Sequence, residues 1–474
     1  MAAAAAGAVA ALMAALLLAL LWRLAWRPRA VARAFARQGV RGPPYTFLAG
    51  SLPEMKRLLI AGRVGVAPLD ATCHDIMPVL LPMFHRWVAH YGKTFLFWIG
   101  PIPAFFSTDL HLVKQVLADR TGLYQKDFLI PVLNFLFGNG VVFINGDDWK
   151  RHRKVVLPAF THDKIKSMSA VTAEVTKQMM QQWREQAHQS GGKGAAEIDM
   201  IVAFNDLTSR INGRVAFGTS HQDVEEVVAF MREMQKLATS ATLDAPILWY
   251  LPTRRNWQVW RVNKQLRSKI MSIMQARLAA KGGGDCGNDL LGLLLEAWTP
   301  QRMAGAETLT TDEVGDAGEA PSADVLGQLK LLHMVLLEAS RLYPPFVYIQ
   351  RRAAMDAVLG GIKVPRGTVV SIPIAMLHRD KEVWGPDADE FNPMRFEHGA
   401  AKAAKDPKAL LTFSMGPRVC TGQSFGIVEA QVAMAMILSK FSFSLSPKYV
   451  HKPKYLLSLT PRRGMPLIVK NLDG

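Results

Sequence analysis

The chain has 474 residues, half of them apolar, so it can bury a large core and is not a disordered segment. Its three cysteines (Cys73, Cys286 and Cys420) contain no CxxC pair, which excludes a dense disulfide framework and a four-cysteine zinc site. The formal net charge of +17 favours anionic partners such as membrane lipid or an acidic protein. We expect no nucleic-acid partner, because the basic residues are dispersed and neither zinc-finger spacing nor an RNP-like aromatic motif occurs.

Residues 1–22 carry no charged side chain, and as a helix they would span roughly 30 Å, the thickness of a bilayer core. Arginines follow at positions 23, 27, 29, 33 and 37, whereas a cleaved signal peptide has its basic residues before the apolar run. This order favours a retained single-pass anchor with the remaining chain in the cytosol. The alternative is a cleaved transit or signal segment. We expect three parts: an anchor over 1–22, a basic, proline-containing hinge over 23–52 (with Gly42, Pro43 and Pro44), and one large domain over 53–474.

The body is predicted to be mainly α-helical with small β-sheets. Amphipathic helix patterns cover residues 109–118, 164–185, 225–238, 257–280 and 326–342, and short strand patterns cover 94–99, 367–374, 455–460 and 466–469. A GxGxxG pattern at Gly282, Gly284 and Gly287 follows a helix pattern and not a strand. We therefore interpret it as a helix end and loop, and not as a dinucleotide site.

One cysteine lies in a loop that suits an iron ligand. The string Phe413-x-x-Gly416-x-Arg418-x-Cys420-x-Gly422 precedes a long apolar helix pattern. A thiolate is an electron-donating haem ligand that favours O–O cleavage, and the positive end of the helix would lie near its charge. The glycines permit a close approach of backbone to porphyrin, and the arginine can pair with a propionate. The alternative for a lone cysteine is a buried structural residue.

The whole string resembles the haem-binding signature of the cytochromes P450, and further motifs follow in that family's order. Trp149 and Arg153 resemble the WxxxR motif, and the resemblance implies that both contact haem propionates, together with Arg418 and with Arg351 of the tandem Arg351–Arg352. It also implies that Cys420 is the iron ligand. Taken singly, each of these arginines would be an ordinary solvated charge.

The segment Glu338-Ala339-Ser340-Arg341 resembles the ExxR motif of the same family. The resemblance implies that Arg395, in the run FNPMRF, joins Glu338 and Arg341 in a buried triad that braces the core without taking part in chemistry. Alone, such a pair at i and i+3 would be a surface ion pair of little energetic value.

The resemblance implies a cytochrome P450 fold that holds haem b (iron protoporphyrin IX). The runs around the WxxxR and ExxR motifs look most like the plant clan that hydroxylates fatty acids, gibberellins, brassinosteroids and cytokinins. Such enzymes lie in the endoplasmic-reticulum membrane and insert an oxygen atom from O2 into an apolar small molecule. NADPH–cytochrome P450 reductase supplies the electrons. The resemblance also implies that segment 344–349 lines the substrate pocket, with Phe346 and Val347 as contacts.

A basic cluster is a candidate face for the reductase, which presents an acidic surface. It is formed by Lys150, Arg151, Arg153, Lys154, Lys405 and Lys408. The alternative is a solvated basic face without a partner.

The chain departs from the family where the long distal helix should lie. Residues 304–308 read AGAET, similar to the family's proton-guiding segment, but Pro300 stands before them and residues 310–313 read as a capping box that starts a helix. Only 30 positions separate Thr308 from Glu338. We therefore expect that most of the distal helix and its successor are absent, with a junction near residues 314–315. Because one wall of the pocket would be lost, we expect little or no hydroxylase activity; the alternative to an active enzyme is an impaired isoform or gene-model variant.

Overall fold

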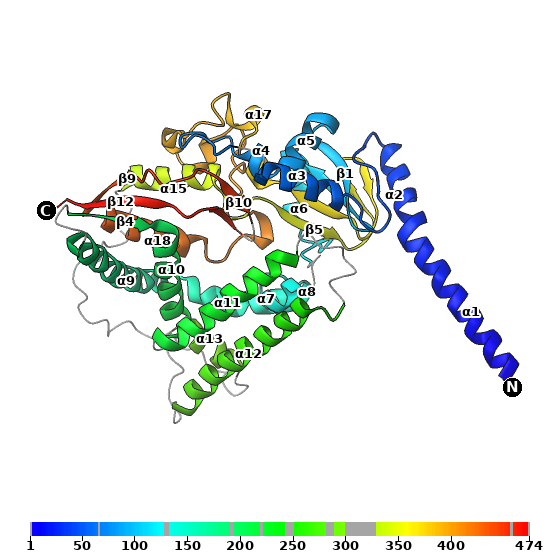
Figure 1. Ribbon diagram of the computed structural model, residues 1–474, viewed down its shortest axis with the longest axis horizontal. Helices are drawn as coiled ribbons and strands as arrows, with labels where there is room; N and C mark the ends of the chain where they lie inside the picture. The colour runs from blue at the N-terminus through cyan, green and yellow to red at the C-terminus, as the bar shows by residue number, and fades with distance from the viewer. Residues whose placement is uncertain are drawn as a thin grey trace.

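The computed structural model describes residues 2–64, 67–127, 132–189, 194–218, 221–241, 251–280, 289–298, 329–455 and 458–472. It is mainly helical with small sheets, which confirms the predicted fold class (Figure 1). Four predicted features lie outside the described residues: the GxGxxG run, the AGAET segment, the capping box and the junction near 314–315.

The N-terminal helix projects from the body as α1 (Ala2–Leu21), passes through a π-helical turn (Trp22–Trp26) and continues as α2 (Arg27–Ala36) (Figure 1). Its apolar part is long enough to cross a membrane and is not buried against the body. It is therefore a candidate single-pass membrane anchor.

The segment that we expected to be a hinge is packed against the body. Phe35 is fully buried and stacks on Phe105 of the sheet, with ring centroids 5.9 Å apart. The Tyr45 hydroxyl donates to the Leu24 carbonyl at 2.7 Å, and Arg27 donates to a body carbonyl. The amphipathic spacing of the apolar residues in α2 explains this docking, because it gives the basic helix a buried stripe.

The main sheet has five strands in the order β1-β2-β8-β5-β3. These are β1 (Thr94–Ile99), β2 (Ile102–Ser107), β8 (Val369–Ile372), β5 (Ile349–Ala353) and β3 (Tyr124–Gln125). It is mixed: β1 and β2 are antiparallel, whereas β2 and β8 are parallel with Phe105 opposite Val370. The helices α3 (Leu52–Val64), α4 (Met77–Leu80), α5 (Pro82–Tyr91) and α6 (Leu110–Leu117) lie around this sheet (Figure 1). A short hairpin pairs β6 (Ala357–Leu359) with β7 (Ile362–Val364).

The other half of the body is mostly helical (Figure 1). Its helices are α7 (Val132–Phe137), α8 (Gly146–Val156), α9 (His162–Gln189), α10 (Met200–Phe217), α11 (His221–Ala241), α12 (Arg254–Ala280), α13 (Leu290–Trp298), α15 (Lys330–Leu342) and α18 (Gln423–Leu438). The short helices α16 (Ile374–Leu377) and α17 (Lys381–Trp384) follow β8. A small sheet in the order β4-β12-β9 closes this half, with β4 (Ala195–Asp199), β12 (Pro466–Asn471) and β9 (Phe441–Leu445).

The predicted helices at 109–118, 164–185, 225–238 and 257–280 are confirmed by α6, α9, α11 and α12, and the strand at 94–99 is β1. The predicted strand at 455–460 is wrong in detail. It is two strands, β10 (Pro453–Tyr455) and β11 (Leu459–Pro461), which pair with each other as a hairpin.

We predict that Phe35→Ala will lower the free energy of unfolding by about 3–5 kcal/mol, because it leaves a cavity in a fully buried position. Urea unfolding of the full chain in detergent, followed by circular dichroism, measures this. The control is Phe47→Ala, since Phe47 is 52% exposed. Equal effects of the two substitutions would show that α2 is not docked.

Candidate functional site

The cysteine loop is closed by a backbone hydrogen bond in which the Cys420 N–H donates to the Phe413 carbonyl at 3.0 Å. A 3₁₀ turn (Gly416–Arg418) lies inside it, and α18 begins three residues after the cysteine. The Cys420 side chain is exposed and lines a large cavity, together with Phe413 and Arg418. The loop therefore presents a free thiol to the cavity at the start of a helix.

The two glycines of the cysteine loop do not have the predicted role of letting the backbone approach a porphyrin. Gly416 has a φ of +73°, and a Cβ there would collide with the Leu117 carbonyl at the end of α6. Glycine is thus required for contact with the protein's own backbone. Gly422 has ordinary room, since a Cβ would lie 3.6 Å from Phe160. Neither glycine lines the cavity, so the expected close approach of backbone to porphyrin has no support at these two positions.

Two guanidinium groups lie over the indole ring of Trp149. Arg153 lies 5.6 Å and Arg418 lies 4.5 Å from the ring centroid. Arg153 also donates to the Val419 carbonyl at 3.1 Å, and Arg418 donates to the Ile144 carbonyl at 2.6 Å. The helix α8 and the cysteine loop are thus joined directly. All three side chains line the cavity.

Six lysine and arginine residues line this cavity, and four of them come from the segments around the cysteine loop: Lys126, Arg153, Arg351 and Arg418. Arg351 is only 4% exposed, and burial, followed by the charge of Arg418, lowers its pKa to about 10. Its neighbour Arg352 pairs with Asp127 at 2.8 Å, so Arg351 is the member of the tandem that belongs to the site. Among the described lining residues, Asp127 is the one carboxylate, and it is already paired.

Lys126 was missed in the sequence, where no motif marks it. Burial and the charges of Arg351 and Arg418 lower its pKa to about 7. Its backbone is fixed by Asn145, which both accepts from the Lys126 N–H and donates to the Lys126 carbonyl. Buried cations without anions are costly, so this cluster calls for an anionic ligand.

The residues present fit a haem. The cavity has a volume of about 1170 Å³, larger than the roughly 300–1,000 Å³ usual for small-molecule sites, and its lining is mostly apolar. It contains a thiol that can ligate iron and cations that can pair with two propionates. The structure therefore brings together Trp149, Arg153, Arg351, Phe413, Arg418 and Cys420.

The two predicted substrate contacts differ. Phe346 lines the cavity and is 51% exposed, so it stays a predicted substrate contact. Val347 is fully buried in the core between α4, α5 and the main sheet, and it does not line the cavity. Adjacent residues of an extended segment point to opposite sides, so one of the two had to face away.

The predicted triad is present. Arg341 and Glu338 are both fully buried and form a bidentate pair with N–O distances of 2.6 and 2.7 Å. Arg395 lies 3.7 Å from Glu338, but its closest carboxylate is Asp387, at 2.7 Å. The Asn392 N–H also donates to Glu338, so the acid is held both by Arg341 of α15 and by the FNPMRF run that contains Asn392 and Arg395.

A buried histidine that we missed connects this triad to the cysteine loop. His378 lies within hydrogen-bond distance of the Arg341 carbonyl at Nδ1 (3.0 Å), and its Nε2 accepts from the Leu411 N–H at 2.8 Å. Burial lowers its pKa to about 3, so the ring is neutral at physiological pH. The apolar stretch before His378 is the sequence signal for its burial.

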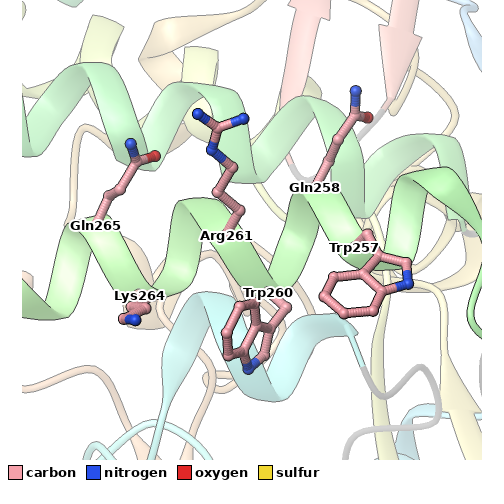
Figure 2. A pocket seen from close by; sticks show the side chains of 6 residues that line it. All are labelled: Trp257, Gln258, Trp260, Arg261, Lys264 and Gln265. Carbon is pink, nitrogen blue, oxygen red and sulfur yellow. The ribbon is translucent and has the colours of Figure 1, made fainter.

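A second hollow lies on the outer surface of α12 and is a separate feature (Figure 2). It has a volume of about 540 Å³ and is lined by Trp257, Gln258, Trp260, Arg261, Lys264 and Gln265. Its lining residues include no thiol and no acid. It is therefore no candidate for the catalytic site.

Comparison with known proteins agrees with this geometry. The sequence model described as "Cytochrome P450" matches residues 80–317 and 310–468. Cytochrome P450 709B3 of Arabidopsis thaliana is 35% identical over 485 aligned positions, which cover 92% of each chain. Cytochrome P450 734A6 of Oryza sativa subsp. japonica is 35% identical over 492 positions (92% of this chain, 90% of the relative). Secologanin synthase 1 of Catharanthus roseus is 34% identical over 489 positions (92% of each).

The chain belongs to the cytochrome P450 family. It is by family a monooxygenase with a haem-iron cofactor, which implies oxygen, a redox partner and a small-molecule substrate.

We predict that the His378→Gln variant will lose less stability than the native chain on acidification. The pKa of His378 is lower in the folded chain (about 3) than its ordinary 6.5, so the unfolded chain binds a proton first as the pH falls. The associated stability is fully present above pH 6.5 and is lost as the pH falls from there towards 3. Urea unfolding at pH 7 and pH 4 measures the difference, expected to be of the order of 3 kcal/mol. The exposed His111 (His111→Gln) is the control, and equal pH slopes for all three chains would contradict the prediction.

Proposed function

We propose that this chain is a haem b protein of the endoplasmic-reticulum membrane whose site hydroxylates an apolar small molecule with O2. In this proposal, Cys420 ligates the iron, and Trp149, Arg153, Arg351, Arg418 and Lys126 hold the propionates. Phe413, Gly416 and Gly422 shape the cysteine loop, Glu338, Arg341 and Arg395 brace it from behind, and Phe346 contacts the substrate. When bound, the haem supplies oxygen-activating chemistry, and the thiolate favours cleavage of the O–O bond.

The observation that carries the proposal is that one cavity holds both a free thiol and a group of cations, one buried and three half-buried, whereas the described lining has a single carboxylate, which is already paired. A dianionic porphyrin edge would neutralise these cations, and Cys420, which lines the same cavity, would ligate the iron. The apolar part of the lining excludes water and favours an apolar substrate.

NADPH–cytochrome P450 reductase is the proposed electron donor. All of the basic cluster except Arg153 is exposed, but Lys150 pairs with Asp147 and Arg151 pairs with Asp148, so only Lys154, Lys405 and Lys408 lack such a partner among the ion pairs of the described chain. Arg153 lines the cavity and donates to the Val419 carbonyl. The candidate docking face is therefore smaller than the sequence indicated, and its charge is carried by three lysines.

A second candidate function is an impaired isoform that binds haem or the reductase with little turnover. The alignment with Cytochrome P450 709B3 runs over 485 positions, although 92% of a 474-residue chain is about 436 residues. About fifty positions of the relatives thus have no counterpart here. The family model also matches in two pieces that meet at residues 310–317, the interval of the expected junction. Both observations support the loss of a long helix, which would open the pocket to water and lower coupled oxygen chemistry.

We predict that the full chain, produced with ample haem, will show the reduced CO-difference band typical of thiolate haem, and that Cys420→Ala will abolish it. Cys73→Ala is the matched control and should keep the band, since Cys73 lies outside the cavity. A colourless native chain, or a band that survives Cys420→Ala, would overturn the haem-thiolate proposal. Substrate-dependent NADPH consumption with added reductase then separates the two candidates, because the impaired isoform should show the band with little turnover.

A further inference from the structure

Two tyrosines end in the substrate cavity with their hydroxyl groups unused. Tyr348, next to β5, and Tyr455, at the end of β10, both line the cavity. Neither hydroxyl makes a hydrogen bond to any of the residues that the structure describes. The third tyrosine of the lining, Tyr343, differs because its hydroxyl lies 2.6 Å from Nδ1 of His74.

Both side chains lie deep in the protein, yet both keep some accessible surface, because the cavity reaches them. Their rings meet edge to face, with centroids 5.4 Å apart, and Phe84 packs against Tyr348. The Leu459 N–H donates to the Pro345 carbonyl at 2.9 Å and ties the hairpin of Tyr455 to the segment of Tyr348. The two phenols are therefore held together on a fixed part of the wall.

A polar group in an apolar surrounding costs free energy unless it finds a hydrogen-bond partner. The surroundings of this pair are apolar, with Met83 and Leu80 also in the lining. A site with two such hydroxyls discriminates strongly in favour of a ligand that can bond to them and against the same ligand without the polar atom.

The surroundings also indicate the charge of the partner. Phe84, Met83 and Leu80 surround the two phenols with apolar side chains. Burying a carboxylate in such surroundings costs more free energy than burying a neutral oxygen, because hydroxyl groups alone do not balance its charge. A neutral oxygen fits the pair better than a carboxylate.

We propose that Tyr348 and Tyr455 form the polar end of the substrate cavity and select apolar molecules that carry a neutral hydroxyl or carbonyl oxygen. This inference rests on the proposed function, in that the cavity is taken to be the substrate site. It assigns to the two phenols a role in binding orientation, because a substrate held at its oxygen presents a defined carbon to the rest of the cavity.

The test uses three probes of matched shape: 1-adamantanol, 1-methyladamantane and 1-adamantanecarboxylate. Isothermal titration calorimetry on the full chain in nanodiscs measures their affinities. We expect the alcohol to bind roughly tenfold more tightly than the hydrocarbon, with the carboxylate weaker than the alcohol. In the Y348F/Y455F double variant, the affinity for the hydrocarbon should be kept and the preference for the alcohol should fall to less than about threefold.

The control is Tyr124→Phe. Tyr124 is buried, and its hydroxyl also has no partner in the described chain, but it does not line the cavity. This variant should keep the full preference for the alcohol. Equal binding of alcohol and hydrocarbon to the native chain, absence of binding by both, or a preference that survives the double substitution overturns the inference. The CO-difference band reports on the haem proposal separately, so a chain with the band and without the preference refutes the tyrosine pair alone.

Discussion

The buried ion pair between Glu338 and Arg341 holds the site-forming half of the molecule together. Both side chains are fully excluded from solvent, and a buried charge without a partner is strongly destabilising. Arg341 donates to both oxygens of Glu338 and to the carbonyls of His378, Ala388 and Glu390. One guanidinium thus fixes α15 and two stretches of the following chain in a single arrangement. His378 extends this arrangement to Leu411, just before the cysteine loop.

In the cavity, unlike in the Glu338–Arg341 cluster, the positive charges are not balanced by carboxylates among the described lining residues. Arg351, Arg418 and Lys126 are brought together by different parts of the chain, and burial lowers the pKa of each. In the cluster of Glu338, Arg341 and Arg395 the acidic and basic side chains pair with one another, whereas the cations of the cavity lack such partners among its described lining residues. This difference in charge balance distinguishes residues that support the fold from residues that are available to bind an anionic ligand.

Much of this could be predicted from the sequence, because the motifs contain residues whose physical roles are local. The spacing of Glu338 and Arg341 places them on one helix face, and the WxxxR spacing places Trp149 and Arg153 one turn apart. Helices with strong periodicity, such as α9 and α12, were also predictable.

The rest depends on contacts between distant segments, which no local pattern contains. Lys126 becomes part of the site only because β3 ends beside the cysteine loop and Asn145, and Val347 was misassigned because the direction of one extended residue decides between core and cavity. The docking of residues 23–52 was missed because arginines and prolines hide the buried stripe that ends at Phe35.

The docked α2 has a consequence for how the protein meets its surroundings. Since α1 and α2 form one continuous helical rod tied to the sheet through Phe35 and Tyr45, the body cannot swivel about a flexible tether. With the candidate anchor in a bilayer, the body would keep one orientation relative to the membrane, and one side of it would face the lipid. A molecule dissolved in the leaflet would then approach the protein from one direction only, and a soluble partner would find its docking face at a constant height above the membrane.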